Sequence, residues 1–326
     1  MEAVNCVLAA DLGGTMLRLG WWQDGEMRQT LTAKTELMRG AEGVIDQIVA
    51  LALGADMPPV SRLVLATAGT LDARTGFVHH SANLPFEAVP LRQLLSQRMD
   101  VPVIVIGDAE AAALGEFCVG SAAGANEGLF VTVSTGIGMG IVFQGRLASG
   151  TTSQPGELGH ITVDLSEQAP LCRCGQRGCL ETYAAGTGLV ARFRDAVGVS
   201  VQQHELSARD VLEAASLGHQ PAADLVQRGA DLLGAALAAM VRVFAPEALV
   251  LGGGLTNSPY YVALIRHRFE DIFEASQPAA GSLLRLARCQ PNSGLVGAAL
   301  LGSGHPKAIE LIQGSSLAKQ LYEADE

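Results

Sequence analysis

Short apolar runs that end in glycine or other small residues recur along the chain and predict buried strands. The first two runs flank the pair Gly13–Gly14 and are expected to form a strand–turn–strand unit. The same pattern returns at LFVTVSTGIGMGIVFQG, and a third run, ALVLGGGLT, ends in three glycines. The strands predicted in this way cover Val4–Asp11, Thr15–Trp22, Arg62–Ala66, residues 103–106, the segment 129–145 and the segment 248–256.

Segments with helical spacing alternate with these strands and predict an α/β fold. The expected helices cover residues 44–53, 109–117, 232–241 and 315–326. Two similar glycine turns indicate two related α/β lobes with a cleft between them. We expect a small lobe over residues 1–120, completed by the C-terminal helix 303–326, and a large lobe over residues 121–302. The boundary is placed at Gly120–Asn126, a stretch of small residues.

Composition narrows the function classes. The 326 residues carry a formal charge of −11, which argues against non-specific binding to nucleic acid. No basic region precedes the first apolar run, and the stretch 232–241 is too short to span a bilayer, so we expect a cytoplasmic protein with no membrane partner. Three scattered cysteines, Cys6, Cys118 and Cys289, are interpreted as buried thiols.

The stretch DLGGTMLR combines the residue types that bind a phosphate group. The amides of Gly13 and Gly14 can approach an anion closely if these glycines take backbone angles that other residues avoid. Thr15 adds a hydroxyl and Arg18 a permanent positive charge. Asp11 can hold water around Mg²⁺. The alternative is an ordinary hairpin turn.

A second loop, STGIGMG, offers the hydroxyls of Ser134 and Thr135 among glycines. The two loops together could hold the two ends of a triphosphate, although strand glycines also mark bulges. Asp108 lies between a predicted strand and a predicted helix. It is either a helix cap or a base that accepts a proton from an attacking hydroxyl.

The cysteine cluster predicts a structural zinc site. Cys172, Cys174 and Cys179 lie within eight residues, and His160 in GELGH supplies a fourth ligand, although His79 and His80 are also available. Four such ligands leave no position for a reactive water molecule. Gly175 and Gly178 allow the segment to fold around one ion. The alternative is a set of reduced cysteines without metal.

Three side chains near these motifs suit sugar recognition. Glu157 and Glu181 flank the cysteine cluster, and both could accept hydrogen bonds from sugar hydroxyls. Asn83 could add an amide. Their alternative roles are solvated surface glutamates and a turn residue before Pro85.

Taken in order, DLGGTMLR, STGIGMGIV, GELGH, CRCGQRGCLE and LVLGGG resemble the ROK family of bacterial sugar kinases and sugar-responsive repressors. The resemblance implies an actin-like ATPase (ribonuclease H-like) fold and an enzyme that transfers the γ-phosphoryl group of ATP to the 6-hydroxyl of a hexose. It also implies ATP with Mg²⁺, a structural Zn²⁺, and a homodimer or homotetramer. Glucose is the expected sugar, with N-acetylmannosamine or N-acetylglucosamine as alternatives.

The resemblance also assigns roles to individual residues. Asp108 matches the catalytic base. The ATP-binding positions are matched by Asp11, Gly13, Gly14, Thr15, Arg18, Thr135, Gly136, Gly138, Gly252, Gly253 and Gly254. The sugar-binding positions are matched by Asn83, Asp108, Glu157, His160 and Glu181. The zinc ligands are matched by His160, Cys172, Cys174 and Cys179.

One departure from the family pattern concerns the base. The family usually has asparagine before the catalytic aspartate, and this chain has Gly107, which lacks the amide that commonly binds a sugar hydroxyl. Sugar recognition must therefore be reorganised here, or weakened by about 0.5–1.5 kcal/mol.

Two other functions fit the sequence less well than a sugar kinase does. A sugar-sensing ROK repressor would need a DNA-binding domain before the first phosphate strand, which begins within ten residues of the start. A dinucleotide-dependent oxidoreductase would need GxGxxG spacing and a following acidic residue, and neither TGIGMG nor LGGGLT fits that pattern.

Overall fold

The computed structural model describes residues 6–54, 58–148, 155–198, 206–274 and 283–323. These residues form two compact units that are interleaved along the chain. The first unit takes its described residues from Met1–Asn126, Gly140–Gly156 and Arg288–Glu326, and the second from Glu127–Met139 and Glu157–Ala287. These units are defined by contacts within the chain, whereas the predicted lobes are two bodies on either side of a cleft. The predicted lobe boundary between residues 120 and 121 therefore stays a prediction.

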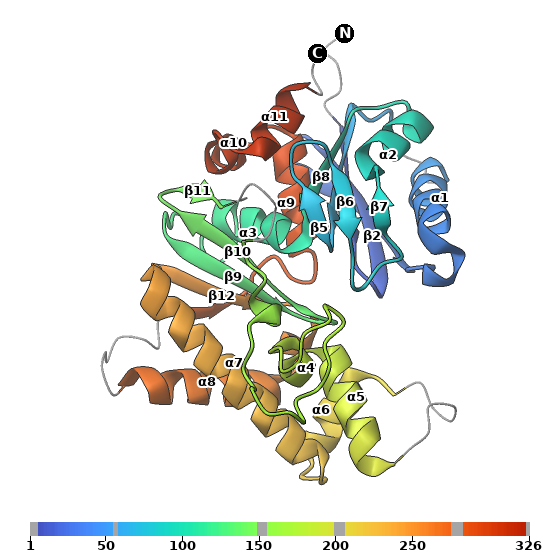
Figure 1. Cartoon of the computed structure of the whole chain (residues 1–326). Coiled ribbons are helices and arrows are strands. Elements are labelled where there is room, and N and C mark those ends of the chain that lie inside the picture. Colours follow the sequence, from blue (N-terminus) through green and yellow to red (C-terminus); the bar gives the residue numbers. More distant parts are fainter. Residues whose placement is uncertain (1–5, 55–57, 149–154, 199–205, 275–282, 324–326) are drawn as a thin grey trace. The chain divides into compact units, whose positions relative to one another are not determined.

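The first unit contains a five-stranded sheet of order β3-β2-β1-β4-β8 and a three-stranded sheet of order β5-β6-β7 (Figure 1). The strands are β1 (Val7–Leu12), β2 (Met16–Gln23), β3 (Glu26–Lys34), β4 (Arg62–Thr67), β5 (Thr70–Asp72), β6 (Phe77–His80), β7 (Glu87–Val89) and β8 (Val103–Gly107). The helices are η1 (Leu37–Arg39), α1 (Gly40–Leu53), α2 (Leu91–Met99), α3 (Asp108–Cys118), α9 (Ser293–Gly302), α10 (Pro306–Ile312) and α11 (Ser316–Glu323).

Parallel pairing in this sheet brings two predicted site residues to one edge. Strands β1, β4 and β8 run parallel, with Leu12 opposite Thr67 and Thr67 opposite Gly107. Asp11 near the end of β1 and Asp108 just after β8 therefore lie at the same carboxyl edge, where open α/β sheets bind ligands.

Both faces of the sheet are covered. Alternate residues of β1, β4 and β8 pack with α1, α2 and the small sheet in one hydrophobic cluster. Helices α3 and α9 pack against each other, and α9 also lies on β1 and β4. The C-terminal α11 is joined to β8 through Gln320, which accepts a hydrogen bond from the Val105 amide at 3.1 Å. Because Gln320 is fully buried, this contact holds α11 against the sheet of the first unit.

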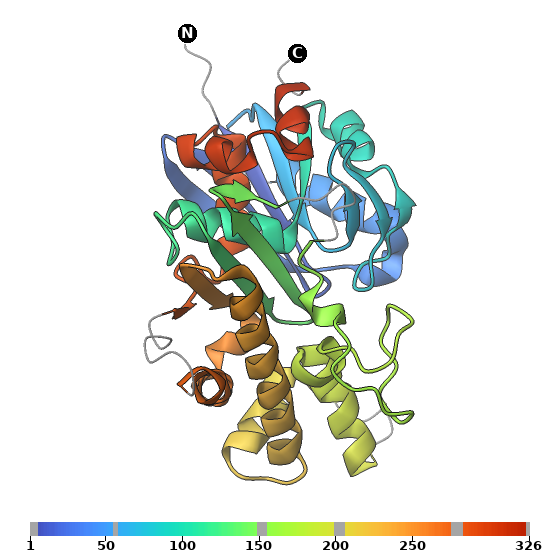
Figure 2. The same cartoon turned by 60° about the vertical axis from the view of Figure 1, so that its left-hand side comes forward.

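The second unit is built on strands of the sheet β11-β10-β9-β12-β13 (Figure 2). The strands are β9 (Gly128–Val133), β10 (Ile137–Phe143), β11 (Arg146–Leu147), β12 (Ala248–Gly252) and β13 (Leu284–Leu286), of which β11 and most of β10 belong to the first unit. The helices are η2 (Leu158–His160), α4 (Glu181–Ala184), α5 (Gly186–Val197), α6 (Ala208–Ser216), α7 (Ala222–Phe244), η3 (Gly254–Asn257) and α8 (Pro259–Glu274).

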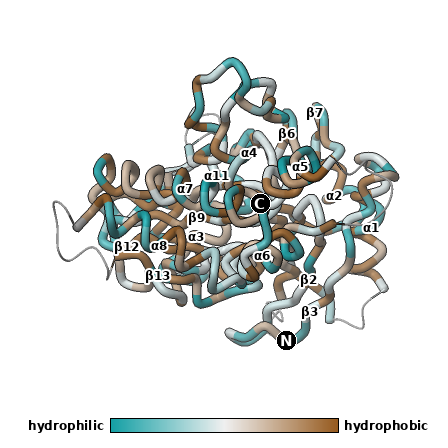
Figure 3. Tube along the Cα trace, turned by 90° about the horizontal axis from the view of Figure 1, so that it is seen from below, coloured by the Kyte–Doolittle hydropathy of each residue, from teal (hydrophilic) through white to brown (hydrophobic). Residues whose placement is uncertain are grey.

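The apolar strands β9 and β12 are parallel and almost fully buried, and Figure 3 marks hydrophobic residues such as theirs in brown. Helix α7 packs on α4, α6 and α8. Within the described residues, no helix is long and apolar enough to cross a membrane.

The predicted strands and helices are confirmed within the described residues, and most of their ends shift by a few positions; residues 4–5 and 324–326 lie outside them. Two expectations differ more: the helix predicted at 232–241 is part of α7, which begins ten residues earlier, and the single C-terminal helix expected over residues 303–326 is two helices, α10 and α11, separated by the turn at residues 313–315. Two expectations about single residues are wrong. Of the three scattered cysteines, Cys6 is fully buried, whereas Cys118 and Cys289 are half-buried. Gly13 and Gly14 do not take left-handed backbone angles; Gly14 is instead needed for space, because an added Cβ atom would lie 2.6 Å from the Asn83 carbonyl oxygen.

Candidate active site

The predicted site residues fall into two groups, one in each compact unit. In the first unit, Asp11 and Arg18 are directly opposite on the antiparallel pair β1–β2. The Arg18 Nη1 atom lies 3.6 Å from Asp11 Oδ2, and both side chains are largely buried. Burial raises the pKa of Asp11 to about 6; the nearby Asp108 adds to this shift and Arg18 opposes it. Asp11 is therefore charged at neutral pH, as binding of a hydrated cation requires.

Asp108 is the first residue of α3, and the N-cap position before it is Gly107. Asp108 Oδ1 accepts a hydrogen bond from the Ala109 amide at 2.8 Å. Burial raises the pKa of Asp108, and backbone amides counter this shift. A half-buried carboxylate with a raised pKa, at the ligand-binding edge of the sheet, has the properties of a general base.

Gly14 and Asn83 meet at the first glycine turn. A Cβ atom added at Gly14 would lie 2.6 Å from the Asn83 carbonyl oxygen, so the approach of these two segments requires glycine. Thr35 closes the other side, because its hydroxyl donates to the Gly13 carbonyl oxygen at 2.7 Å and its amide to the Thr15 carbonyl oxygen at 3.1 Å. The turn is thus held between two neighbouring segments.

Glu116 fixes the far end of α3. Its buried carboxylate accepts four hydrogen bonds, of 2.8 to 3.0 Å: Oε2 from the amides of Ser121 and Arg288, and Oε1 from the Cys289 amide and the Ser293 hydroxyl. Ser293 begins α9. The next residue, Gly294, approaches so closely that an added Cβ would lie 3.2 Å from the Asp11 carboxyl carbon. Glu116 therefore joins the helix that starts at Asp108 to the helix that abuts Asp11.

In the second unit, the loop 134–138 is held by the segments around the cysteine cluster. The Glu181 carboxylate accepts a hydrogen bond from the Ile137 amide at 3.0 Å. The Gly186 amide donates to the Ser134 carbonyl oxygen at 2.8 Å. The Thr187 hydroxyl donates to the Thr135 carbonyl oxygen at the same distance. Glu181 is buried, so it is not a solvated surface residue.

The second loop also lies beside the three glycines that follow β12. Thr132 of β9 is opposite Gly252. A Cβ added at Gly254 would lie 3.4 Å from the Ser134 hydroxyl oxygen. The predicted nucleotide-binding residues of this unit, Thr135, Gly136, Gly138 and the glycines 252–254, therefore gather at one end of β9, β10 and β12.

The four predicted metal ligands lie together. The ligand atoms of His160, Cys172, Cys174 and Cys179 are all within 4.8 Å of one another. Gly178, with φ of +73°, passes so close to Asp164 that a side chain there would collide with its carbonyl group. One imidazole and three thiolates at this spacing fit a tetrahedral zinc site.

The imidazole of His160 connects this cluster to Glu157. Its Nδ1 atom lies 3.5 Å from Cys172 Sγ, and its Nε2 atom lies 3.6 Å from Glu157 Oε2. The Nδ1 atom of the ring therefore faces the cysteines, and the Nε2 atom faces the Glu157 carboxylate. A metal held on Nδ1 would orient the ring and, through it, Glu157.

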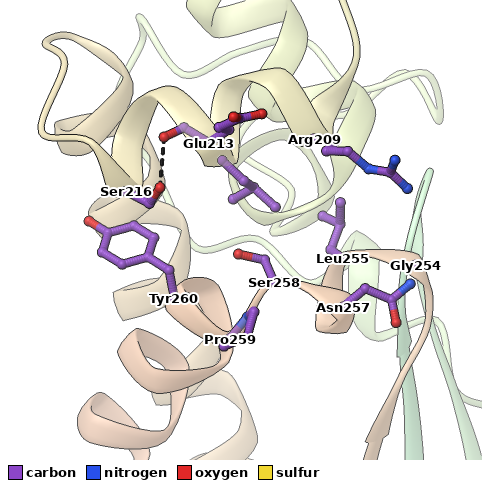
Figure 4. A pocket seen from close by; sticks show the side chains of 10 residues that line it. Arg209, Glu213, Ser216, Gly254, Leu255, Asn257, Ser258, Pro259 and Tyr260 are labelled. Atoms are coloured by element: carbon purple, nitrogen blue, oxygen red, sulfur yellow. Dashed lines mark hydrogen bonds between the residues drawn. The ribbon is translucent and has the colours of Figure 1, made fainter.

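A pocket of about 360 Å³ opens beside Gly254 (Figure 4). Helix α6 forms one wall with Arg209, Glu213 and Ser216, and the start of α8 forms the other. Tyr260 lies at the Ser216 end, and Arg209 lies at the opposite end. A pocket with an aromatic ring, aliphatic side chains and a few polar groups suits a flat heterocycle.

Sequence reasoning missed the residues of this pocket wall, and it also missed Glu110 and Glu116. One signal for α6 was present: Ser207 and Asp210 form a capping box, in which the Asp210 amide donates to the Ser207 hydroxyl at 3.3 Å. Nothing in the local sequence marks Glu116, because its partners come from residues 121 and 288–293.

The sequence matches the model of the ROK family over residues 7–304. It is 34% identical over 256 residues to a glucokinase of Halalkalibacterium halodurans, with 76% of this chain and 77% of that protein covered. It is 30% identical over 307 residues to an N-acetylmannosamine kinase of Citrobacter koseri, with 91% and 98% covered.

Among solved structures, a ROK family glucokinase from Streptomyces griseus in complex with glucose and AMPPNP superposes with a TM-score of 0.79. The identity is 30%, and the match covers 92% of this chain and 99% of that one. The chain belongs to the ROK family, and the predicted α/β, actin-like ATPase fold is confirmed.

Proposed function

We propose that this protein is an ATP-dependent sugar kinase that phosphorylates the 6-hydroxyl of a hexose, with glucose as the first sugar to test and N-acetylmannosamine or N-acetylglucosamine as alternatives. The observation that carries this proposal is the placement of Asp108, a half-buried carboxylate with a raised pKa, at the same sheet edge as Asp11 and Arg18. The relatives named glucokinase and N-acetylmannosamine kinase support it.

In this mechanism, Asp108 accepts the proton of the attacking hydroxyl. The turn at Gly13, Gly14 and Thr15 and the loop at Thr135, Gly136 and Gly138 bind the phosphate groups, and Arg18 adds positive charge. Asp11 would hold Mg²⁺ through water, and the ion would neutralise charge on the phosphate oxygens. The pocket beside Gly254 takes the adenosine, and Gly252 and Gly253, which directly precede Gly254 in the chain, bind the nucleotide with it.

Sugar recognition falls to Asn83 and to the carboxylates near the cysteine cluster. Glu157 and Glu181 present acceptors for sugar hydroxyls, and His160, with its Nδ1 atom turned to the cysteines, presents an Nε2–H donor. A structural Zn²⁺ on His160 and the three cysteines would keep these groups in place. The donor set fits that ion, and no step of phosphoryl transfer passes through it.

A coupled assay of ATP consumption across glucose, mannose, fructose, N-acetylmannosamine and N-acetylglucosamine tests this proposal. We expect one or two of these sugars to give the highest kcat/KM, and the product to carry phosphate on the 6-hydroxyl by NMR. Sugar binding without any ATP consumption would contradict the kinase and favour a sugar-sensing regulator.

A further inference from the structure

The pocket beside Gly254 has one end that lies against the loop proposed to bind phosphate. A Cβ atom added at Gly254 would lie 3.4 Å from the Ser134 hydroxyl oxygen, and one added at Gly253 would lie 2.5 Å from the Val133 carbonyl oxygen. These glycines therefore contact the end of β9, where the loop 134–138 begins. In Figure 4, Gly254 lies at the same end of the pocket as Arg209. A nucleotide with its base in the pocket and its phosphate groups at this loop passes Arg209.

Arg209 is the one positively charged side chain among the described residues that line the pocket. It lies in the first turn of α6, and Figure 4 shows its guanidinium group extended away from Glu213, which lies one turn further along the helix. Its neighbour Asp210 is held by Ser207, because Asp210 Oδ2 accepts hydrogen bonds from the Ser207 amide at 2.8 Å and from the Ser207 hydroxyl at 2.7 Å. Within the described part of the chain, Arg209 forms no salt bridge, so its guanidinium group is available to a ligand.

The rest of the nucleotide site in this unit offers no positive side chain. The loop 134–138 reads STGIG, and residues 252–254 are all glycine. Backbone amides in such loops can bind phosphate oxygens, but the formal charge of the chain, −11, opposes the approach of an anionic nucleotide. An arginine always carries its charge, and its planar guanidinium group can bind two phosphate oxygens at once. Arg209 therefore supplies an attraction that the loops alone lack.

We propose that Arg209 binds the phosphoryl donor through one of the two phosphate groups nearest the ribose. This inference rests on the proposed function, in which the base of the nucleotide lies between α6 and the start of α8. The apolar side chains of Leu212 and Leu255 line the same pocket and contact the base. Arg209 thus selects phosphorylated nucleotides over the nucleoside, whereas the rest of the pocket binds both.

Isothermal titration of the wild type and of Arg209→Ala with ATP, ADP and adenosine, in the presence of Mg²⁺ and without sugar, tests this inference. We expect Kd for ATP and for ADP to rise about tenfold in the variant, and Kd for adenosine to stay within about twofold. Arg209→Lys keeps a positive charge without the planar group and should give an intermediate Kd. Arg268→Ala removes an exposed arginine of α8 that does not line the pocket, and this control should bind all three ligands like the wild type.

Two results of this titration would overturn the inference. An equal loss of adenosine affinity would show that Arg209 only shapes the pocket. An unchanged affinity for ATP would show that Arg209 is a solvated surface residue.

Salt concentration gives a second measurement, which a purely structural role of Arg209 would not change. Raising NaCl from about 0.05 M to about 0.3 M should weaken ATP binding to the wild type more than to Arg209→Ala, because salt screens the charged contact. Equal salt dependence in the two proteins would contradict a contact with phosphate. Failure of the proposed function is a separate result, because it would appear as nucleotide binding without sugar-dependent ATP consumption in the wild-type protein.

Discussion

The Glu181 carboxylate accepts a hydrogen bond from the Ile137 amide at 3.0 Å. This bond joins the residue that follows the cysteine cluster to the loop proposed to bind phosphate. In the proposed function, the other oxygen of Glu181 accepts a hydrogen bond from a sugar hydroxyl, so this one carboxylate would contribute to both ligand sites.

Replacement of Glu181 by Ala should weaken both sugar and ATP binding. The change leaves the buried Ile137 amide without its acceptor, at a cost of about 1–3 kcal/mol. We expect KM to rise for both substrates, measured by steady-state kinetics. Glu181→Gln keeps an acceptor oxygen and serves as the matched control, with a smaller effect on KM for ATP. A rise confined to the sugar would argue against a role of this bond in the loop.

Replacement of Asp108 by Asn should lower kcat at least about a hundredfold and leave sugar affinity largely intact, because the amide keeps the shape of the side chain. Turnover and isothermal titration with the sugar measure the two effects. Near-normal turnover would remove Asp108 as the base.

Metal analysis should find about one zinc ion per chain. Cys174→Ser should lower the zinc content and the melting temperature, whereas Cys118→Ser, a change outside the cluster, should leave the zinc content unchanged. A protein that is fully active without zinc would contradict the proposal that the ion stabilises Glu157 and His160.

Two adjacent glycines offer a test of the first turn. Gly14→Ala places a Cβ 2.6 Å from the Asn83 carbonyl oxygen, whereas Gly13→Ala places one 3.5 Å from its nearest neighbour, the Met16 carbonyl oxygen. We expect Gly14→Ala to lower the free energy of unfolding by about 1–3 kcal/mol and to raise KM for ATP. Gly13→Ala should be tolerated. Equal effects in denaturant unfolding and kinetics would contradict this account of the turn.

The pKa of Glu110 predicts how stability depends on pH. A carboxyl group whose pKa is raised from 4.5 to about 7 on folding binds its proton more tightly in the folded state. It therefore stabilises the fold below pH 4.5, and this contribution is lost as the pH rises towards 7.

Glu110→Gln removes that titration and keeps the acceptor for the Gly107 amide. Relative to this variant, the wild type should lose about 1–3 kcal/mol of unfolding free energy between pH 4.5 and 7.5, measured by chemical denaturation. Glu26→Gln, at an exposed position, should show no such trend. A difference that is constant with pH would show that Glu110 does not titrate in this range.

Much of the fold followed from local sequence. Strands such as β8 consist of β-branched residues in a short run, and α3 of alanines behind an acidic first turn, so the chain's own preferences suffice. The cysteine spacing likewise indicated three of the four residues that lie together in the candidate metal site. The three-stranded sheet β5-β6-β7 was missed because its strands are only three or four residues long.

The remaining features depend on contacts between distant segments. Glu110 looks like an ordinary polar residue of a first helical turn, and the structure shows that its carboxylate caps α3 by accepting a hydrogen bond from the Gly107 amide. Glu116 reads as an exposed polar residue in an alanine-rich helix, and its donors lie up to 177 positions away. No local pattern reports such partners.

Helix α3 begins with Asp108, the proposed catalytic base. Near its other end, the Glu116 carboxylate accepts hydrogen bonds from four donors. Eight residues separate Asp108 from Glu116, or roughly 12 Å along the axis. A rotation of α3 by about 6° around Glu116 would move the Asp108 carboxylate by about 1 Å. A displacement of that size is large enough to slow turnover about a hundredfold. Surface changes near residues 288–293 can therefore act like active-site mutations, and variant libraries that vary this loop will sample catalytic geometry.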